Sequence, residues 1–385
     1  MTLVRRWAQA LRPTHVTHPL GALLFGVRLS AALVAMRRLS GAASTPSPVS
    51  AVSDDGRPRR DAEPELPTID VVVPARDEAE RIGPLLDAIV GAPGVSRVIV
   101  VDDQSTDGTA AVAAAGGAEV VSGTALPDGW AGKAWALQQG ISAADAQWVV
   151  TLDADARPAP KLPAALVRRA VGDGYDLLTV GGRFDCPTPG TRWLHASMLT
   201  TLVYRFGPPG AALRPDRMMA NGQCMTLRRV DFLADGGMEP VAGDVVEDVA
   251  LARHRGTIGR RVGFLDASDL LTVRMFESIG DTWRGWGRSL ALPGIEPRTR
   301  QLLDLAVVSI AQALPLPRLL LRRGDVLDGV LLAARLGTLA GTRRAYDRGD
   351  VAYWASPLAD LASVAAIARG IGRGRAQTWR GRTYS

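Results

Sequence analysis

The feature that most constrains this fold is a short apolar run that ends in two carboxylates. Residues 147–152 include Val149, Val150 and Leu152, and this length and β-branched content are typical of an interior strand. Asp153 and Asp155 follow at once. Burying a charged side chain inside such a strand is unfavourable, so both aspartates should lie just after the strand ends. That end is at the carboxyl edge of the sheet, where open α/β sheets bind ligands. Such a pair can hold a divalent metal and a diphosphate, but it is also a common solvated turn.

Strands that alternate with helices in short units surround this run. The pattern predicts a doubly wound, mainly parallel α/β sheet. We expect strands at 69–73, 97–101, 119–121, 147–152, 176–180, 222–227, 261–265 and 270–275. Helices are expected over 82–89, 133–143, 162–171, 193–206 and 246–255.

Apolar residues are concentrated at the two ends of the chain. Hydrophobic residues make up 47% of the 385 residues, and the excess lies near the N-terminus and after Gln301. We expect an N-terminal basic and apolar membrane-anchor segment (1–40), a flexible linker (41–67), a catalytic-type α/β domain (68–295) and C-terminal apolar helices with an arginine-rich tail (296–385). The apolar C-terminal segments are 305–317, 326–341 and 351–368, and prolines at 315 and 317 should kink the first.

The charge balance points to an anionic surface as a partner. The net charge is +6, and the residues after Asp360 include five arginines and no acidic residue. Beside apolar segments such a tail suits the cytoplasmic leaflet of a membrane. Nucleic acid is not expected, because aromatic platforms and binding motifs are missing. Two cysteines and four histidines form no zinc or disulfide pattern, so a reducing, cytoplasmic setting is predicted.

Three strand ends carry acidic residues: Asp77-Glu78, Asp102-Asp103 and the Asp153/Asp155 pair. Each alone is explained by an ordinary turn or helix cap. Together at one sheet edge they favour a hydroxyl-rich, metal-bound ligand such as a sugar nucleotide. The expected metal is Mg²⁺ or Mn²⁺.

Two further positions have both a structural and a functional interpretation. Lys133 follows Gly132 at a helix start, where it could meet an anion, although the spacing of a phosphate-binding ATPase loop fails at Pro127 and Ala134. Glu247 and Asp248 begin a helix, as acidic residues often do. A carboxylate there could also deprotonate an acceptor hydroxyl.

The ordered motifs resemble family 2 inverting glycosyltransferases of the GT-A fold. The similarity rests on Val71-Val72-Val73-Pro74-Ala75-Arg76-Asp77-Glu78, Val101-Asp102-Asp103-Gln104-Ser105-Thr106-Asp107-Gly108-Thr109 and Asp153-Ala154-Asp155, and covers about residues 68–290. The segments Gly129-Trp130-Ala131-Gly132-Lys133, Tyr353-Trp354-Ala355-Ser356-Pro357-Leu358-Ala359-Asp360 and Trp379-Arg380-Gly381-Arg382-Thr383-Tyr384 look like the membrane-associated members of carotenoid and hopanoid pathways.

The resemblance implies a role for each motif. Pro74, Arg76, Glu78 and Asp103 would hold the nucleotide. Asp153 would support the ribose–diphosphate side, and Asp155 would meet the metal directly. Asp248, beside Glu247, would be the catalytic base.

The resemblance also implies the reaction, the transfer of one sugar, such as a UDP-hexose sugar, to a lipid-like acceptor such as a carotenoid, hopanoid or other isoprenoid. The processive Gln-x-x-Arg-Trp motif is not matched around Trp283-Arg284-Gly285-Trp286-Gly287-Arg288, which favours a single transfer. The catalytic domain is expected on the cytoplasmic side of the cell membrane. Two alternatives stay open: a non-catalytic, membrane-associated nucleotide-binding scaffold, and a polysaccharide or dolichol-phosphate-type sugar transferase.

Overall fold

The chain forms two compact units, which are described separately. The computed structural model describes residues 19–41, 46–50, 67–211, 214–373, 377–379 and 382–384. The helical unit comprises Met1–Ser44, Cys186–Pro208 and Met275–Gly374, and the sheet unit comprises Thr45–Asp185, Pro209–Arg274 and Arg375–Ser385. Most of the expected linker, the first 18 residues, and Arg375 and Arg380 of the basic tail lie outside the described residues.

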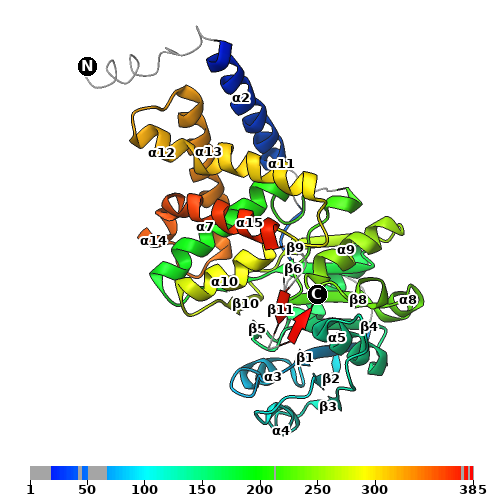
Figure 1. Ribbon diagram of the computed structural model, residues 1–385. Helices are drawn as coiled ribbons and strands as arrows, with labels where there is room; N and C mark the ends of the chain where they lie inside the picture. Colours follow the sequence, from blue (N-terminus) through cyan, green and yellow to red (C-terminus); the bar gives the residue numbers. More distant parts are fainter. Residues whose placement is uncertain are drawn as a thin grey trace, which may run out of the picture. The chain divides into compact units, whose positions relative to one another are not determined.

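The sheet unit is built on a seven-stranded sheet in the order β3-β2-β1-β4-β8-β6-β9 (Figure 1). All neighbours are parallel except β8, which runs antiparallel to both β4 and β6. The predicted mainly parallel α/β sheet is therefore confirmed. The strands are β1 (Ile69–Ala75), β2 (Val95–Asp102), β3 (Glu119–Ser122), β4 (Trp148–Leu152), β6 (Leu177–Gly181), β8 (Cys224–Arg228) and β9 (Val262–Asp266).

Two smaller sheets complete this unit. Strand β10 (Leu271–Arg274) lies between β5 (Ala156–Pro158) and β7 (Arg183–Asp185), and β11 (Gln377–Trp379) pairs with β12 (Arg382–Tyr384). The sequence did not predict β5 or β7, because three residues are too few to show a period of two. The helices of the unit are α3 (Gly83–Ile89), α4 (Thr109–Ala115), α5 (Gly132–Ala143), α6 (Leu162–Asp173), α8 (Arg229–Ala234), α9 (Glu247–Thr257) and the 3₁₀ turns η2 (Pro215–Arg217) and η3 (Glu239–Val241).

Close packing of α5 on the sheet fixes one side of the later site. All five residues of β4 are buried, and so are Val71, Val72 and Val73 of β1. On α5, a Cβ at Gly140 would lie 2.4 Å from Val72 Cγ1, so only glycine permits this approach. Helix α5, which carries Lys133 in its first turn, therefore packs against β1 and β2.

The helical unit gathers three separated chain segments around one core. Its elements are α2 (Pro19–Ser40), α7 (Pro189–Phe206), α10 (Ile279–Ser289), α11 (Arg298–Val308), the π-helical turn η4 (Ser309–Ala313), α12 (Pro315–Leu320), α13 (Val326–Thr342), η5 (Arg343–Ala345), α14 (Val351–Trp354), η6 (Ser356–Ala359) and α15 (Asp360–Arg373). Helix α7 begins with a capping box between Thr188 and Thr191, and it packs on α2, α10, α14 and α15.

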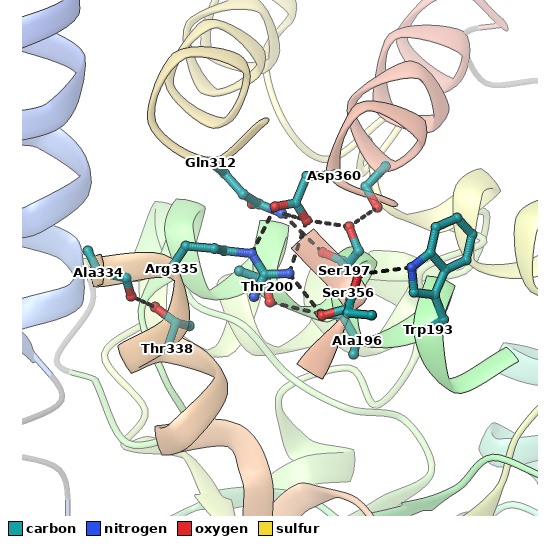
Figure 2. A network of polar contacts seen from close by, with 12 residues as sticks. Trp193, Ala196, Ser197, Thr200, Gln312, Ala334, Arg335, Thr338, Ser356 and Asp360 are labelled. Atoms are coloured by element: carbon teal, nitrogen blue, oxygen red, sulfur yellow. Dashed lines mark hydrogen bonds and ion pairs between the residues drawn. The ribbon is translucent and has the colours of Figure 1, made fainter. Parts of the chain in front are cut away.

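The interior of this unit contains a buried ion pair. Arg335 on α13 donates from Nε to Asp360 Oδ2 at 2.9 Å, and both side chains are 1% exposed. The other oxygen, Oδ1, accepts from Ser197 at 2.6 Å and Gln312 at 2.9 Å (Figure 2). One carboxylate therefore joins α7, η4, α13 and α15.

Two of the apolar C-terminal segments are each divided into several helical elements. Residues 351–368 form α14, η6 and α15, because Pro357 interrupts the backbone hydrogen bonding. Residues 305–317 divide into the end of α11, a π-helical turn and α12, which begins at Pro315. In the described residues, two stretches are long and apolar enough to cross a membrane, Leu20–Ser40 and Arg298–Leu320.

Candidate active site

The acidic strand ends meet at one edge of the sheet. Strands β2, β1 and β4 are neighbours and parallel, with Ala75 opposite Asp102 in the register. The residues that follow them, Arg76 to Glu78, Asp103 and Asp153, therefore leave the sheet at the same edge. This is the edge at which α/β sheets bind ligands.

The loops after β1 and β2 are tied to each other. Arg76 Nη1 donates to the Asp103 carbonyl at 2.8 Å, and the Asp103 side chain is 2% exposed. Asp77 has a left-handed backbone, with φ of 53°, and its Oδ1 accepts from the Thr106 amide at 2.9 Å. The Glu78 amide donates to Thr109 Oγ1 at 2.9 Å. Together with Pro74, which is half-buried near the end of β1, these loops form a preorganised polar rim.

Lys133 connects two of the predicted carboxylates. Its Nζ lies 2.8 Å from Asp153 Oδ1 and 3.0 Å from Glu247 Oε1. Burial opposes protonation of Lys133, but the carboxylates of Asp153 and Glu247 outweigh burial, so the pKa of Lys133 is raised. Lys133 therefore stays protonated between the carboxylates at the end of β4 and at the start of α9.

A close approach of two backbone segments makes this bridge possible. The Ala131 amide donates to the Ala242 carbonyl at 2.6 Å, and a Cβ at Gly243 would lie 2.9 Å from the Gly129 carbonyl. Gly129 also has a φ of 81°, which favours glycine. The glycines thus bring the loop before Lys133 beside the loop before Glu247.

Asp248 is oriented by two backbone amides. Its Oδ2 accepts from the Gly222 amide at 2.7 Å, and its Oδ1 accepts from its neighbour Val249 at 2.8 Å. Burial, reinforced by the Glu247 carboxylate, raises the pKa of Asp248 to about 7, against the opposing effects of Lys133 and the two amides. A carboxyl group with this pKa can exchange a proton near neutral pH.

The sequence did not indicate a role in the site for the segment from Asn221 to Cys224. The Gly222 amide orients Asp248, and the Gly222 carbonyl lies 3.5 Å from Lys133 Nζ. The Gln223 carbonyl accepts from the Asp153 amide at 3.0 Å. Burial, together with Asp153, raises the pKa of the Cys224 thiol, so this group stays protonated. The available signal was an Asn-Gly pair before a strand, where glycine often marks a close backbone approach.

The carboxylates suit a cation that arrives with a ligand. Carboxylate oxygens are the donors that Mg²⁺ and Mn²⁺ prefer, and Mg²⁺ commonly uses one or two of them beside substrate phosphates. Asp153 and Asp155 meet that description. Among the described residues, no group of three or more His, Cys, Asp or Glu could hold a metal without such a ligand. A divalent metal at Asp153 and Asp155 would therefore need further oxygen donors, such as the phosphates of a ligand.

Comparisons with known proteins agree with this arrangement. Residues 70–237 match the family model described as "Glycosyl transferase family 2". Two 4,4'-diaponeurosporenoate glycosyltransferases of Staphylococcus aureus are similar over short segments, one 42% identical over 89 residues (23% of this chain, 24% of the relative) and one 43% identical over 86 residues (22% and 23%). The similarity thus spans about a quarter of these relatives.

Among solved structures, a mannosyltransferase from Pyrobaculum calidifontis in complex with GDP-Man and Mn²⁺ is 19% identical and has a TM-score of 0.49, covering 94% of this chain and 97% of that one. A glucosyl-3-phosphoglycerate synthase from M. tuberculosis is 24% identical with a TM-score of 0.40, covering 58% and 78%. The family match and the strand order together identify residues 70–237, which lie mostly in the sheet unit, as a family 2 glycosyltransferase domain with the GT-A fold.

Proposed function

We propose that this protein transfers a single sugar, with inversion, from a nucleoside diphosphate donor such as a UDP-hexose to a lipid-like acceptor at the cytoplasmic face of a membrane. The acceptor class is a carotenoid, hopanoid or other isoprenoid that offers a hydroxyl or carboxyl oxygen. The observation that carries the proposal is Asp248, a carboxylate with a pKa of about 7, held by two amides beside Lys133.

Asp248 acts as the general base. It accepts the proton of the acceptor oxygen while that oxygen forms a bond to the anomeric carbon of the sugar. The bond from that carbon to the β-phosphate oxygen breaks on the opposite side, and the nucleoside diphosphate leaves with the bonding electrons. Attack from one face and departure from the other invert the anomeric centre.

The residues that bind the nucleotide-sugar donor also stabilise the leaving nucleoside diphosphate. Arg76, Glu78 and Asp103 on the polar rim bind the nucleoside, and Pro74 shapes the end of β1. Lys133 places a positive charge 2.8 Å from Asp153, where the diphosphate is expected, and it offsets the charge that develops there. Asp155 and Asp153 would hold a divalent metal, which supplies further charge neutralisation to the departing diphosphate.

The acceptor class is supported by the relatives and by the helical unit. The relatives with the similar segments are named 4,4'-diaponeurosporenoate glycosyltransferases. Two described stretches have the length and composition to cross a membrane. The arginines at the end of α2, Arg37 and Arg38, favour a cytoplasmic position for that end.

A transfer assay with a base-deficient variant tests the proposal. Purified protein, radiolabelled UDP-sugars, Mn²⁺ and membrane lipids should give a labelled lipid. The variant Asp248→Asn should lose at least about 100-fold of the transfer rate, the low end of general-base contributions. Its affinity for UDP with Mn²⁺, measured by thermal shift, should persist.

The matched control is Asp269→Asn in the same unit, an exposed aspartate paired with Arg183. It should transfer at the normal rate. Loss of UDP binding in Asp248→Asn would remove Asp248 from the base role, and an absence of both transfer and donor hydrolysis with all common donors would overturn the enzymatic proposal. Metal-dependent UDP binding without turnover would favour a nucleotide-binding scaffold.

A further inference from the structure

The helical unit carries most of the large apolar side chains that are exposed in the described residues. Of the 27 large apolar side chains that are exposed in the described residues, 22 lie in the helical unit and five in the sheet unit. The interior holds a buried apolar cluster and, beside it, the Arg335–Asp360 pair with Ser197 and Gln312 (Figure 2). In water this arrangement is unfavourable, because exposed apolar surface has an unfavourable hydration free energy. In lipid it is the expected one.

Helix α2 buries small residues and exposes large apolar ones. Its buried residues are small: Ala31, Ala32 and Ala35 are at most 8% exposed. Its outward residues are large, with Leu23 63% and Leu33 62% exposed. Small residues let helix backbones approach closely in a membrane, where large apolar side chains gain nothing from being buried. The buried face packs on α7, η4, α11 and α13 of the same unit.

The single charge inside the apolar run of α2 is paired. Arg28 contacts Asp325 at 2.6 Å and Asp328 at 2.6 Å, and Asp328 is also 3.0 Å from Arg318. Two arginines and two aspartates make this cluster neutral. An unpaired arginine at the centre of a membrane helix is costly, and intramembrane charges therefore pair inside the bundle.

The other end of α2 is held by a second contact. Arg38 lies 2.9 Å from Asp304 on α11, while its neighbour Arg37 is exposed. The 22 residues of α2 extend about 33 Å at 1.5 Å per residue, close to the thickness of a hydrocarbon core. An exposed arginine at one end is the arrangement expected at a headgroup boundary.

We propose that α2 is embedded in the lipid bilayer as a docked part of the helical unit, with Leu23, Leu24, Val27 and Leu33 against acyl chains and Arg28 clamped by Asp325 and Asp328. This inference rests on the membrane association in the proposed function and specifies it: α2 is a packed element, not a free tether. The clamp allows a charged residue at this depth because its charge is neutralised within the unit.

Spin labels on α2 test the environment of its outward face. The full chain carries a nitroxide at Leu24→Cys or Leu33→Cys, and the native Cys186 and Cys224 are buried and should not react. The matched control is Val230→Cys, an exposed apolar position of the sheet unit. Each protein is bound to phosphatidylcholine–phosphatidylglycerol vesicles. Collisions with O₂, which concentrates among acyl chains, are compared with collisions with a polar nickel complex, which lipid excludes.

The labels at positions 24 and 33 should collide with O₂ about threefold or more often than with the nickel complex, because polar solutes are excluded from hydrocarbon. The label at 230 should show the reverse preference. Equal or greater nickel access at 24 and 33 would overturn the proposal. So would protection from both reagents with dipolar broadening, since that result means a second copy of the chain covers α2. Neither readout depends on sugar transfer, so it is independent of the fate of the enzymatic proposal.

The clamp is tested in the same vesicles. Arg28→Met leaves Asp325 without its arginine, whereas Arg37→Met removes an exposed charge. In the Arg28 variant the label at 33 should become several-fold more mobile, because α2 loses a polar attachment to α13. In the Arg37 variant the mobility of the label should not change. Equal mobility in both variants would mean that Arg28 does not hold α2. Thermal-shift binding of UDP verifies that the sheet unit of each variant is folded.

Discussion

The protonation state of Asp248 decides when the site can accept a proton. The pKa of Asp248 is raised to about 7, and the base must be deprotonated to act. Below pH 7 the fraction of active protein should therefore fall about tenfold for each pH unit, and above pH 7 it should level off. We expect kcat/KM for transfer to follow this curve between pH 5 and pH 9. UDP affinity over the same range is the reference, and a kcat/KM that is flat from pH 5 to 8 would assign the proton to another group.

Gly222 is predicted to control the position of the base. A Cβ at residue 222 would lie 3.1 Å from Glu247 Oε1 and 3.2 Å from Lys133 Nζ, so Gly222→Ala must displace these groups by a few tenths of an ångström. We expect kcat to fall about 10- to 100-fold, because small misplacements of catalytic groups carry costs of that order. The KM for the donor should change much less.

Gly172→Ala is the matched control, since a Cβ at Gly172 of α6 meets nothing within 4 Å. That variant should keep full activity. If Gly222→Ala behaves in the same way, the Gly222 amide does not set the geometry of Asp248.

The placement of the residues proposed to bind the donor could be predicted from the sequence, because it needs only a parallel sheet. Once β2, β1 and β4 are neighbours, Asp103, Glu78 and Asp153 must leave the sheet at one edge. Gly222 could not be found in this way. Its role depends on β8 running antiparallel to β4, which brings its loop from 26 residues before Asp248 to hydrogen-bond distance. A contact made by a backbone amide does not require a particular side chain, so it leaves no recognisable pattern in the sequence.

At the scale of elements, the local pattern of the sequence predicted α3, α5, α6, α7 and α9 but not α8 or α10, and long-range contacts determine which elements these helices pack against. Helix α7 follows from its apolar composition, yet its place in the helical unit depends on Asp350, Ala355 and Asp360, more than 150 residues away. The divided segment at 351–373 depends on one proline within an apolar run. Such features are set by tertiary packing, which a period in the sequence does not encode.

The ion pair that joins four elements should be strongly stabilising in context. Arg335→Met leaves the 1% exposed Asp360 carboxylate without a counter-charge, and such a loss typically costs about 3–5 kcal/mol. We expect the free energy of unfolding of the helical unit, measured by denaturation in detergent, to fall by that order. Replacing Asp360 by leucine as well should restore part of the loss, because no charge is then left buried.

The reference for this prediction is the exposed pair Arg97–Asp145, in which the aspartate side chain is 81% exposed. Asp145→Asn should change stability by less than about 1 kcal/mol. If Arg335→Met costs no more than Asp145→Asn, the network in Figure 2 is not needed for the packing of the four elements.

At the scale of the whole molecule, the two units are interleaved along the chain. The segments 186–208 and 275–295 lie inside the range 68–295, but they pack with the helical unit. A chain that ends at residue 295 keeps α7 and removes the partners of its buried groups: Arg192 loses Asp350, Trp193 loses Ala355 and Ser197 loses Asp360. The apolar and polar surfaces that α7 buries in the full chain would then both be exposed.

We therefore expect the chain 1–295 to aggregate in a detergent that keeps the full chain monodisperse, as measured by size-exclusion chromatography with light scattering. The aggregation should persist at low temperature, because it arises from missing core contacts and from unpaired buried polar groups. Each such unpaired group costs about 1–3 kcal/mol or more. A monodisperse 1–295 chain that still binds UDP with Mn²⁺ would show that α7 and α10 do not need the C-terminal helices. In the expected case, the donor site cannot be separated from the helical unit by cutting the chain once, because the chain passes between the two units several times.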